Sequence, residues 1–81
     1  MKTEIIIKRL SKFGKVDHND INNYFVKINN HFIEFFNQNG LVICLKVRKE
    51  DDENDIQSDY SAGVFVKTLK SALNSVGVKD G

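Results

Sequence analysis

The sequence HFIEFFNQNGLVICLKVR, residues 31–48, decides the fold, because two apolar runs flank a turn within it. Asn39-Gly40 is typical of a β-hairpin turn, since glycine adopts a positive φ without a Cβ clash. Residues 31–48 therefore predict two antiparallel strands, and the other predicted elements pack on this hairpin.

The loop length of this hairpin determines which side chains share a face. A two-residue loop would pair Glu34 with Leu45 and place a charge on the apolar face. A three-residue loop at 38–40 instead pairs Phe35 with Ile43 and keeps one face apolar. We therefore expect the three-residue loop.

This register predicts an apolar inner face and a mixed outer face. The inner face consists of Ile33, Phe35, Leu41, Ile43, Leu45 and Val47. The outer face consists of Phe32, Glu34, Phe36, Val42, Cys44, Lys46 and Arg48. Aromatic residues on an outer face are usually covered by the same chain, and the alternative is a contact patch for a partner or a second copy.

A second hairpin extends the first. Residues 24–28 alternate as a strand does, and Asn29-Asn30 suits a two-residue type I′ turn. This turn pairs Val26 with Ile33, in agreement with the register above, so three strands form an antiparallel meander. The added inner-face residues are Tyr24, Val26 and Ile28, and the added outer-face residues are Phe25 and Lys27.

Residues 3–13 predict an amphipathic helix. Ile6, Leu10 and Phe13 recur at helical spacing, although three consecutive isoleucines also suit a strand. The exposed side of this helix is basic, with Lys8, Arg9, Lys12 and Lys15. Such a side is usually only solvated, and the alternative is a surface for an anionic partner.

Residues 61–76 predict a second helix. Its apolar stripe is Phe65, Leu69, Ala72, Leu73 and Val76. Asp59 or Ser61 is the expected N-cap, and Gly77 is the expected left-handed residue that ends the helix. The chain is therefore predicted to be one α+β domain over residues 1–81, in the order α-β-β-β-α, with both helices on one face of a three-stranded antiparallel meander.

Two segments have the composition of loops. Residues 16–23 are rich in Asp and Asn, and Asp17, His18 and Asp20 match no metal-ligand spacing. Residues 49–59 hold six of the 11 acidic residues, which repel one another and predict a solvated loop. These acidic residues are Glu50, Asp51, Asp52, Glu53, Asp55 and Asp59.

The composition argues for a non-catalytic intracellular protein. With 12 basic and 11 acidic residues, the near-zero net charge argues against direct binding to nucleic acid or membrane. One cysteine, Cys44, excludes an internal disulfide and fits the cytoplasm, and no signal peptide or membrane span is evident. Cys44 lies far from His31 in the predicted register, so we expect no nucleophile–base pair and no enzyme. We also expect no metal and no cofactor.

The hairpin and the segment after it resemble a known family. The shared features are a strand at 32–36, Asn39-Gly40, a strand at 41–48 ending in basic residues, an acidic run at 50–55, and Asp59-Tyr60-Ser61-Ala62-Gly63 before a helix. They resemble the large polyvalent protein-associated domains of phage and plasmid proteins, and residues 8–14 resemble that family's first helix. Ser61 stands where the family pattern has an aromatic residue. The resemblance implies a mobile-element origin, a bacterial host cytoplasm and an accessory role.

These observations favour a protein-binding inhibitor of a bacterial defence component, similar in kind to an anti-CRISPR protein. The host partner would be a nucleic-acid-binding protein whose basic channel accepts the acidic loop in place of phosphates. The predicted partner-binding residues are Glu50, Asp51, Asp52, Glu53, Asp55, Asp59, Tyr60, Phe25, Phe32 and Phe36.

Two alternatives use the outer sheet face. Phe25, Phe32 and Phe36 beside basic residues would stack the bases of a single-stranded nucleic acid. The same aromatic face would otherwise pair two copies of the chain in a homodimer.

Overall fold

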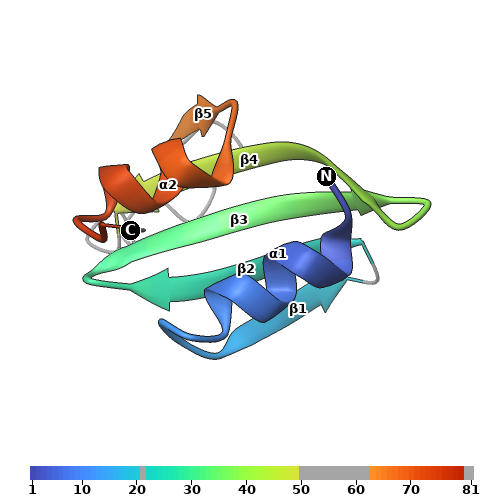
Figure 1. Cartoon of the computed structure of the whole chain (residues 1–81), viewed down its shortest axis with the longest axis horizontal. Coiled ribbons are helices and arrows are strands. Elements are labelled where there is room, and N and C mark those ends of the chain that lie inside the picture. Colours follow the sequence, from blue (N-terminus) through green and yellow to red (C-terminus); the bar gives the residue numbers. More distant parts are fainter. Residues whose placement is uncertain (21, 50–62, 80–81) are drawn as a thin grey trace.

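The computed structural model describes residues 1–20, 22–49 and 63–79. Within these ranges the chain forms two helices and five strands (Figure 1). They are α1 (Thr3–Leu10), β1 (Val16–Asp20), β2 (Asn23–Ile28), β3 (His31–Gln38), β4 (Leu41–Lys49), β5 (Val64–Val66) and α2 (Leu69–Ser75). The predicted α+β class is confirmed, and the sheet has two more strands than the predicted meander.

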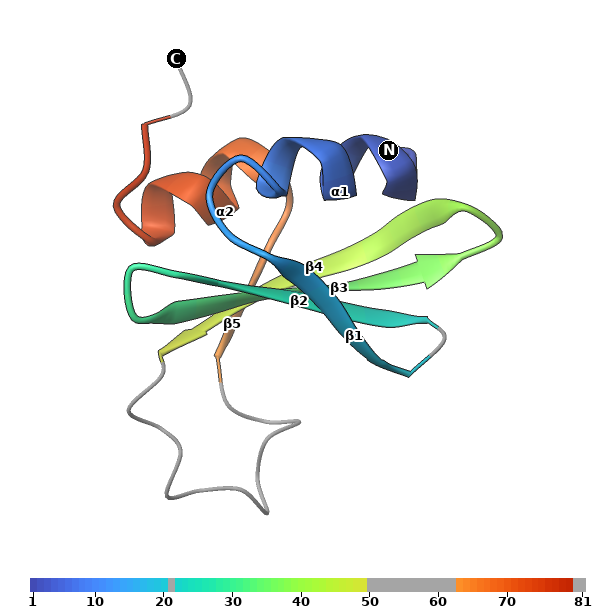
Figure 2. The same cartoon turned by 90° about the horizontal axis from the view of Figure 1, so that it is seen from below.

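The strands form one antiparallel sheet in the order β1-β2-β3-β4-β5, so β2, β3 and β4 are its central strands. Both helices lie on the same face of this sheet (Figure 2). We call the helix-covered face the inner face and the opposite one the outer face. The described residues therefore form two layers, with both described helices on the inner face of the sheet.

The turn between β2 and β3 agrees with the sequence prediction. Asn29 and Asn30 have φ values of 50° and 63°, as a type I′ turn requires. Val26 pairs with Ile33 and Ile28 with His31, which confirms the predicted register.

The predicted register between β3 and β4 is wrong. The loop has two residues, Asn39 and Gly40, and the pairing is irregular between Phe36 and Asn37. Asn37 pairs with Val42 and Phe36 with Cys44, so Ile43 is the extra residue of a β-bulge.

The bulge changes which β4 side chains face the helices. It places Glu34 opposite Lys46 instead of Leu45, so the short loop no longer brings a charge into the core. Val42 packs against the core instead of facing outward. Leu41 and Ile43, which were predicted to be inner-face residues, are 49% and 59% exposed.

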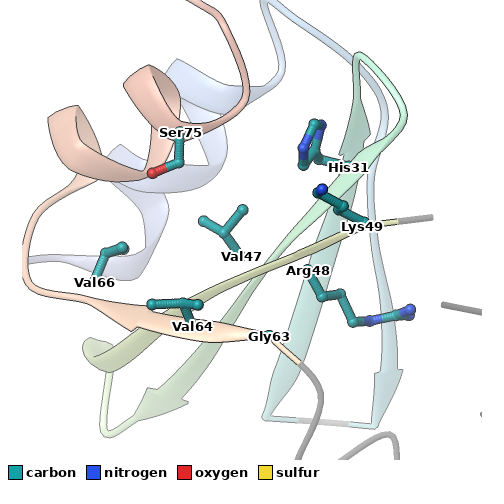
Figure 3. A pocket seen from close by; sticks show the side chains of 8 residues that line it. All are labelled: His31, Val47, Arg48, Lys49, Gly63, Val64, Val66 and Ser75. Carbon is teal, nitrogen blue, oxygen red and sulfur yellow. The ribbon is translucent and has the colours of Figure 1, made fainter. Parts of the chain in front are cut away.

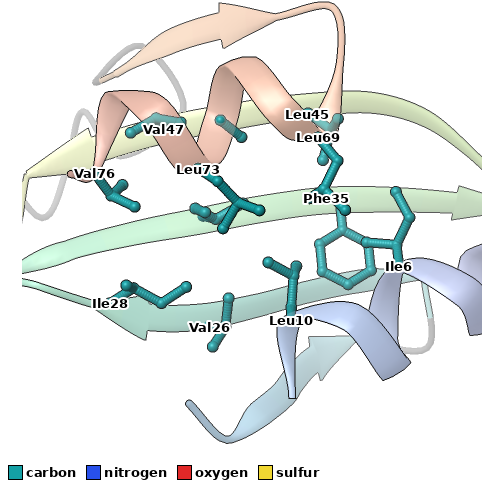
Figure 4. Packing of buried hydrophobic residues seen from close by; sticks show 12 residues of the cluster. Ile6, Leu10, Val26, Ile28, Phe35, Leu45, Val47, Leu69, Leu73 and Val76 are labelled. Carbon is teal, nitrogen blue, oxygen red and sulfur yellow. The ribbon is translucent and has the colours of Figure 1, made fainter. Parts of the chain in front are cut away.

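The core lies between the inner face and the two helices (Figure 4). Phe35 of β3 is its largest fully buried side chain. The buried apolar residues are Ile6, Leu10, Val26, Ile28, Ile33, Phe35, Leu45, Val47, Leu69, Ala72, Leu73 and Val76. Apart from Leu41 and Ile43, the predicted inner-face residues are thus buried, and Tyr24 is partly buried against the core.

The first helix is shorter than predicted, since it ends at Leu10 instead of near Phe13. Ile6 and Leu10 are buried, and the four basic residues of its predicted exposed side are exposed. Thr3 is buried, and its hydroxyl donates to Asn37 Oδ1 at 2.5 Å, which joins the start of α1 to β3.

The segment predicted as a loop at 16–23 contains β1. Val16 pairs with Val26 and Asp17 with Phe25. Backbone pairing with β2 stabilises this strand, and its polar side chains are tolerated because an edge strand is solvated. The loop predicted from the composition of residues 16–23 is therefore wrong for residues 16–20.

The predicted helix at 61–76 is confirmed in its C-terminal half and is wrong for residues 64–66. Residues 64–66 form β5 and only Leu69–Ser75 are helical. Thr68 is the N-cap, and its Oγ1 accepts a hydrogen bond from the Ser71 N–H at 3.1 Å. The predicted caps Asp59 and Ser61 lie outside the described residues. Gly77, with φ of 84°, ends the helix as predicted.

Candidate binding surface on the outer sheet face

The register places aromatic and charged side chains in rows across the outer face. One row runs from Phe25 on β2 through Glu34 and Lys46 to Phe65 on β5. The next row contains Lys27, Phe32 and Arg48. The outer face is therefore neither a simple solvated face nor a closed core.

One half of this face is tied together by its own side chains. Arg48 Nε donates to Glu34 Oε2 at 2.8 Å, and the Arg48 guanidinium carbon lies 4.5 Å from the Phe32 ring centroid. The Phe32 and Phe25 rings contact edge to face at 6.2 Å between centroids. We call Phe25, Phe32, Glu34 and Arg48 the aromatic–ion cluster. All four are only partly exposed, so they already cover one another.

The other half of the face is more exposed. Phe36 is 41% exposed, Ile43 is 59% exposed and Phe65 is 66% exposed. Phe36 pairs with Cys44 on β4, and Lys46 Nζ lies 5.9 Å from the Phe65 ring centroid. We call Met1, Phe36, Ile43, Cys44 and Phe65 the apolar patch.

A groove at the edge of β4 is lined by four of the five patch residues, all except Phe36. The segment before α1 hydrogen-bonds to one end of that edge, where the Val42 N–H donates to the Met1 carbonyl at 2.9 Å. The short strand β5 covers the edge only from Leu45 to Val47. Met1, Ile43, Cys44 and Phe65 are among the residues that line an open groove of about 420 Å³ between these two segments.

A second open groove of about 400 Å³ lies beside β4, β5 and α2 (Figure 3). Its lining is apolar and basic, and it consists of His31, Val47, Arg48, Lys49, Gly63, Val64, Val66 and Ser75. Val47 points toward α2, whereas Arg48 points away from that helix. Lys49 and Gly63 border residues 50–62, which lie outside the described residues.

The predicted binding residues fall into two groups. Phe25, Phe32 and Phe36 lie on the outer face as predicted, although Phe25 and Phe32 are half-buried. The other predicted residues, Glu50, Asp51, Asp52, Glu53, Asp55, Asp59 and Tyr60, lie outside the described part of the chain.

Sequence reasoning missed Phe65 as a surface residue, because its spacing to Leu69 resembles a helical stripe. The β-branched residues Val64 and Val66 flank Phe65, and Gly63 precedes them. This pattern favours a strand at 64–66.

The polar residues considered for chemistry are dispersed. Cys44 is partly buried on the outer face, and His18 contacts the Tyr24 ring at 5.8 Å between centroids. Within residues 1–20, 22–49 and 63–79, His, Cys, Asp and Glu side chains do not gather in threes as a metal site would need. Of the helices that the structure describes, neither has the length and apolar character to cross a membrane.

The charge is unevenly distributed along the chain. All 12 Lys and Arg residues lie in the described ranges, together with only four of the 11 acidic residues, so 12 minus 4 leaves these ranges a formal charge of +8. Most of the acidic residues therefore lie at 50–59, outside the described ranges, so the near-zero charge of the whole chain argues only weakly against anionic partners.

No family model, no curated protein and no solved structure matches the chain.

Proposed function

We propose that this protein acts by non-catalytic protein–protein binding, and that the apolar patch is the centre of its interface. The observation that carries the proposal is the exposure of Phe36, Ile43 and Phe65 on one half of the sheet face that the helices leave uncovered. Neighbouring exposed apolar side chains of this kind mark protein-interaction surfaces.

The surroundings of the patch support an interface with an apolar centre and a polar rim. Lys46 borders Phe65, and the Glu34–Arg48 pair lies beyond Lys46 in the same part of the sheet. Interfaces commonly place aromatic anchors at the centre and charged groups at the edge, where the charges set orientation and partner choice.

We further propose that the protein is an accessory protein of a phage or another mobile element and that its partner is a defence protein of the bacterial host. This part of the proposal rests on the resemblance of residues 8–14 and 32–63 to the accessory domain family. An inhibitor needs only to occupy a surface of its target, which suits a small domain with an exposed patch. An acidic segment that imitates nucleic acid would add affinity for a basic channel.

The test is affinity capture from bacterial lysate treated with nuclease, using tagged wild-type protein and matched variants. F65S removes the most exposed aromatic of the patch, and F13S removes an exposed aromatic near α1, outside the patch. We expect a partner that wild type and F13S retain and that F65S loses at least about tenfold, or ~1.4 kcal/mol. Equal capture by all three proteins would contradict a role of the patch.

A second candidate function is binding of single-stranded nucleic acid by the aromatic–ion cluster. The charge of +8 on the described ranges and the aromatic side chains of this cluster favour it, and a base that stacks on Phe32 would have to displace the Arg48 guanidinium. Titration of a labelled single strand at low salt decides this candidate. We would expect affinity that falls with added salt and with R48Q, and no binding at tens of micromolar, on the order of non-specific affinities, would exclude it.

A further inference from the structure

The basic residues gather in and around the two helices. Eight of the 12 Lys and Arg residues lie at 1–15 and 67–79, and Glu4 is the only acidic residue of these two ranges, so 8 minus 1 gives them a formal charge of +7. All eight basic side chains are exposed, and they are Lys2, Lys8, Arg9, Lys12, Lys15, Lys67, Lys70 and Lys79. The positive charge of the described ranges is therefore concentrated beside α1 and α2.

The outward face of α1 combines this charge with an exposed apolar side chain. Ile6 and Leu10 are buried in the core. Ile5, Lys8 and Arg9, at positions i, i+3 and i+4, share the face that points away from it. Ile5 is 46% exposed on this face, although an apolar side chain gains nothing from contact with water.

The turn after α1 extends the same face. The N–H groups of Phe13 and Gly14 both donate to the Leu10 carbonyl, at 2.9 and 3.3 Å. Gly14 packs against β2, because a Cβ at this position would lie 2.8 Å from the Lys27 carbonyl oxygen. These contacts hold the exposed Lys12 and the 38% exposed Phe13 beside the end of the helix. We call Ile5, Lys8, Arg9, Lys12 and Phe13 the basic–apolar face.

The two helices lie in one layer above the sheet (Figure 2). Lys70 on α2 is exposed and adds a further charge to this layer. Exposed cations of one layer can approach a flat anionic surface together, and a bilayer with anionic lipids attracts each cation that comes within a Debye length of it. The acidic residues at 50–59 weaken this attraction only if they come equally close to that surface.

We propose that the helix layer binds the surface of an anionic lipid bilayer, with the cations of the basic–apolar face at the headgroups and Ile5 and Phe13 in the interfacial region. Charge complementarity selects an anionic partner. The two exposed apolar side chains select a bilayer over a nucleic acid, because they leave water at a lipid interface, whereas a phosphate backbone offers them no apolar contact.

This binding does not depend on the proposed function. The apolar patch lies on the outer face, which is the side of the sheet away from the helices. A bilayer on the helix side therefore leaves the patch accessible, and the protein could hold a partner at a membrane surface.

The first test is flotation of the full chain with vesicles of phosphatidylcholine, with and without about 40% phosphatidylglycerol, at about 0.05 M salt. Wild type should bind the anionic vesicles at least about tenfold more tightly than the neutral ones. K8E/K12E should weaken this binding at least about tenfold, whereas K27E/K46E, the same charge change on the outer face, should weaken it less than about threefold. Equal losses for the two double variants, or no binding by wild type, would overturn the proposal.

The second test follows the apolar side chains. The chain has no tryptophan, so F13W and F65W each introduce a single fluorescent probe. The emission of F13W should shift to shorter wavelength when anionic vesicles are added, and that of F65W, on the opposite side of the sheet, should not. F13S should weaken vesicle binding about threefold or more without changing its salt dependence, because it removes apolar contact and no charge. Equal responses of F13W and F65W would exclude this orientation even if K8E/K12E fails to fold.

Two further outcomes separate this proposal from its alternatives. Binding to a labelled DNA duplex at the same salt that is at least as tight as vesicle binding, with F13S equal to wild type for both ligands, would overturn the lipid assignment in favour of nucleic acid. Vesicle binding that fails while partner capture stays sensitive to F65S would contradict only this inference. Capture that fails while the vesicle results hold would contradict only the proposed function.

Discussion

Phe35 and Phe36 are consecutive residues of β3, yet the structure uses them in opposite ways. Phe35 is completely buried between the sheet and the helices, whereas Phe36 is 41% exposed on the outer face. The contrast continues within the outer face, where Phe32 lies beneath the Arg48 guanidinium at 4.5 Å, whereas Phe65, with Lys46 Nζ 5.9 Å from its ring centroid, is 66% exposed. An aromatic side chain in this sheet therefore belongs to the core, to a self-covered cluster, or to the exposed surface.

This comparison shows that the outer face is not one uniform binding surface. In the aromatic–ion cluster, the side chains already form an ion pair and cover one another's apolar surface. A partner therefore has to displace these contacts. In the apolar patch, a partner would cover surface that is now hydrated, which is the favourable direction of the hydrophobic effect. The two halves should therefore differ in how mutation affects stability and binding.

The largest expected effect is on the buried side of the comparison. F35A should lower the free energy of unfolding by about 3–5 kcal/mol, because it removes a fully buried ring and leaves a cavity. A small domain has a total stability of roughly 5–15 kcal/mol, so the variant should be partly unfolded at 37 °C. Urea denaturation monitored by circular dichroism measures the change. F13A is the control, and a loss below about 1 kcal/mol for F35A would contradict the core described here.

An intermediate effect is expected for the aromatic–ion cluster. F32A should cost about 1–2 kcal/mol, since it removes a half-buried ring, its edge contact with Phe25 and its contact with Arg48. The same urea experiment provides the measurement, and R48Q and the double variant F32A/R48Q complete a cycle. A purely additive double variant would show that the guanidinium does not stabilise the ring.

The difference between the faces also explains what the sequence could predict. The β2–β3 hairpin was predictable in full, because the Asn29-Asn30 turn and the apolar alternation give the same register. The apolar residues of α1 and the C-terminal half of the second predicted helix were predictable for the same reason. In these segments the local pattern and the buried face agree.

The β3–β4 hairpin could not be predicted completely from alternation, because a bulge adds a residue without a signal in the apolar pattern. A two-residue loop without a bulge would pair Glu34 with Leu45 and bring a charge to the apolar face. The bulge at Ile43 pairs Glu34 with Lys46 instead, so the two-residue loop is compatible with an apolar core. The exposed position of Ile43 and the inward position of Val42 both follow from this single residue.

The edge strands were missed for a different physical reason. A strand such as β1 gains its stability from backbone pairing with β2, so its side chains need not be apolar. At β5, the spacing of Phe65 and Leu69 imitates a helix, and only the pairing with β4 distinguishes the two. The exposed positions of Ile43 and Phe65 were therefore beyond the sequence, whereas Phe25, Phe32 and Phe36 were correctly assigned to the outer face.

A smaller effect is expected for the ion pair of the aromatic–ion cluster. E34Q should destabilise the protein by about 1 kcal/mol, because the Arg48 guanidinium then loses a charged acceptor at a partly solvated position. The cost should shrink when the urea titration is repeated in about 1 M salt, where the charges are screened. K49Q, a change at an exposed basic residue of the same strand, is the control, and an E34Q cost that is independent of salt would point to packing instead of charge.

The smallest expected effect on stability belongs to the apolar patch. F65S should change the free energy of unfolding by no more than about 0.5 kcal/mol, because the ring is two-thirds exposed and lies on a short edge strand. The same variant should nevertheless weaken partner capture from lysate at least about tenfold. A small change in the free energy of unfolding together with a large loss of binding would show that the Phe65 side chain contributes to binding and not to the fold. If F65S instead unfolds the protein as F35A does, Phe65 is part of the core and the distinction between the two faces fails.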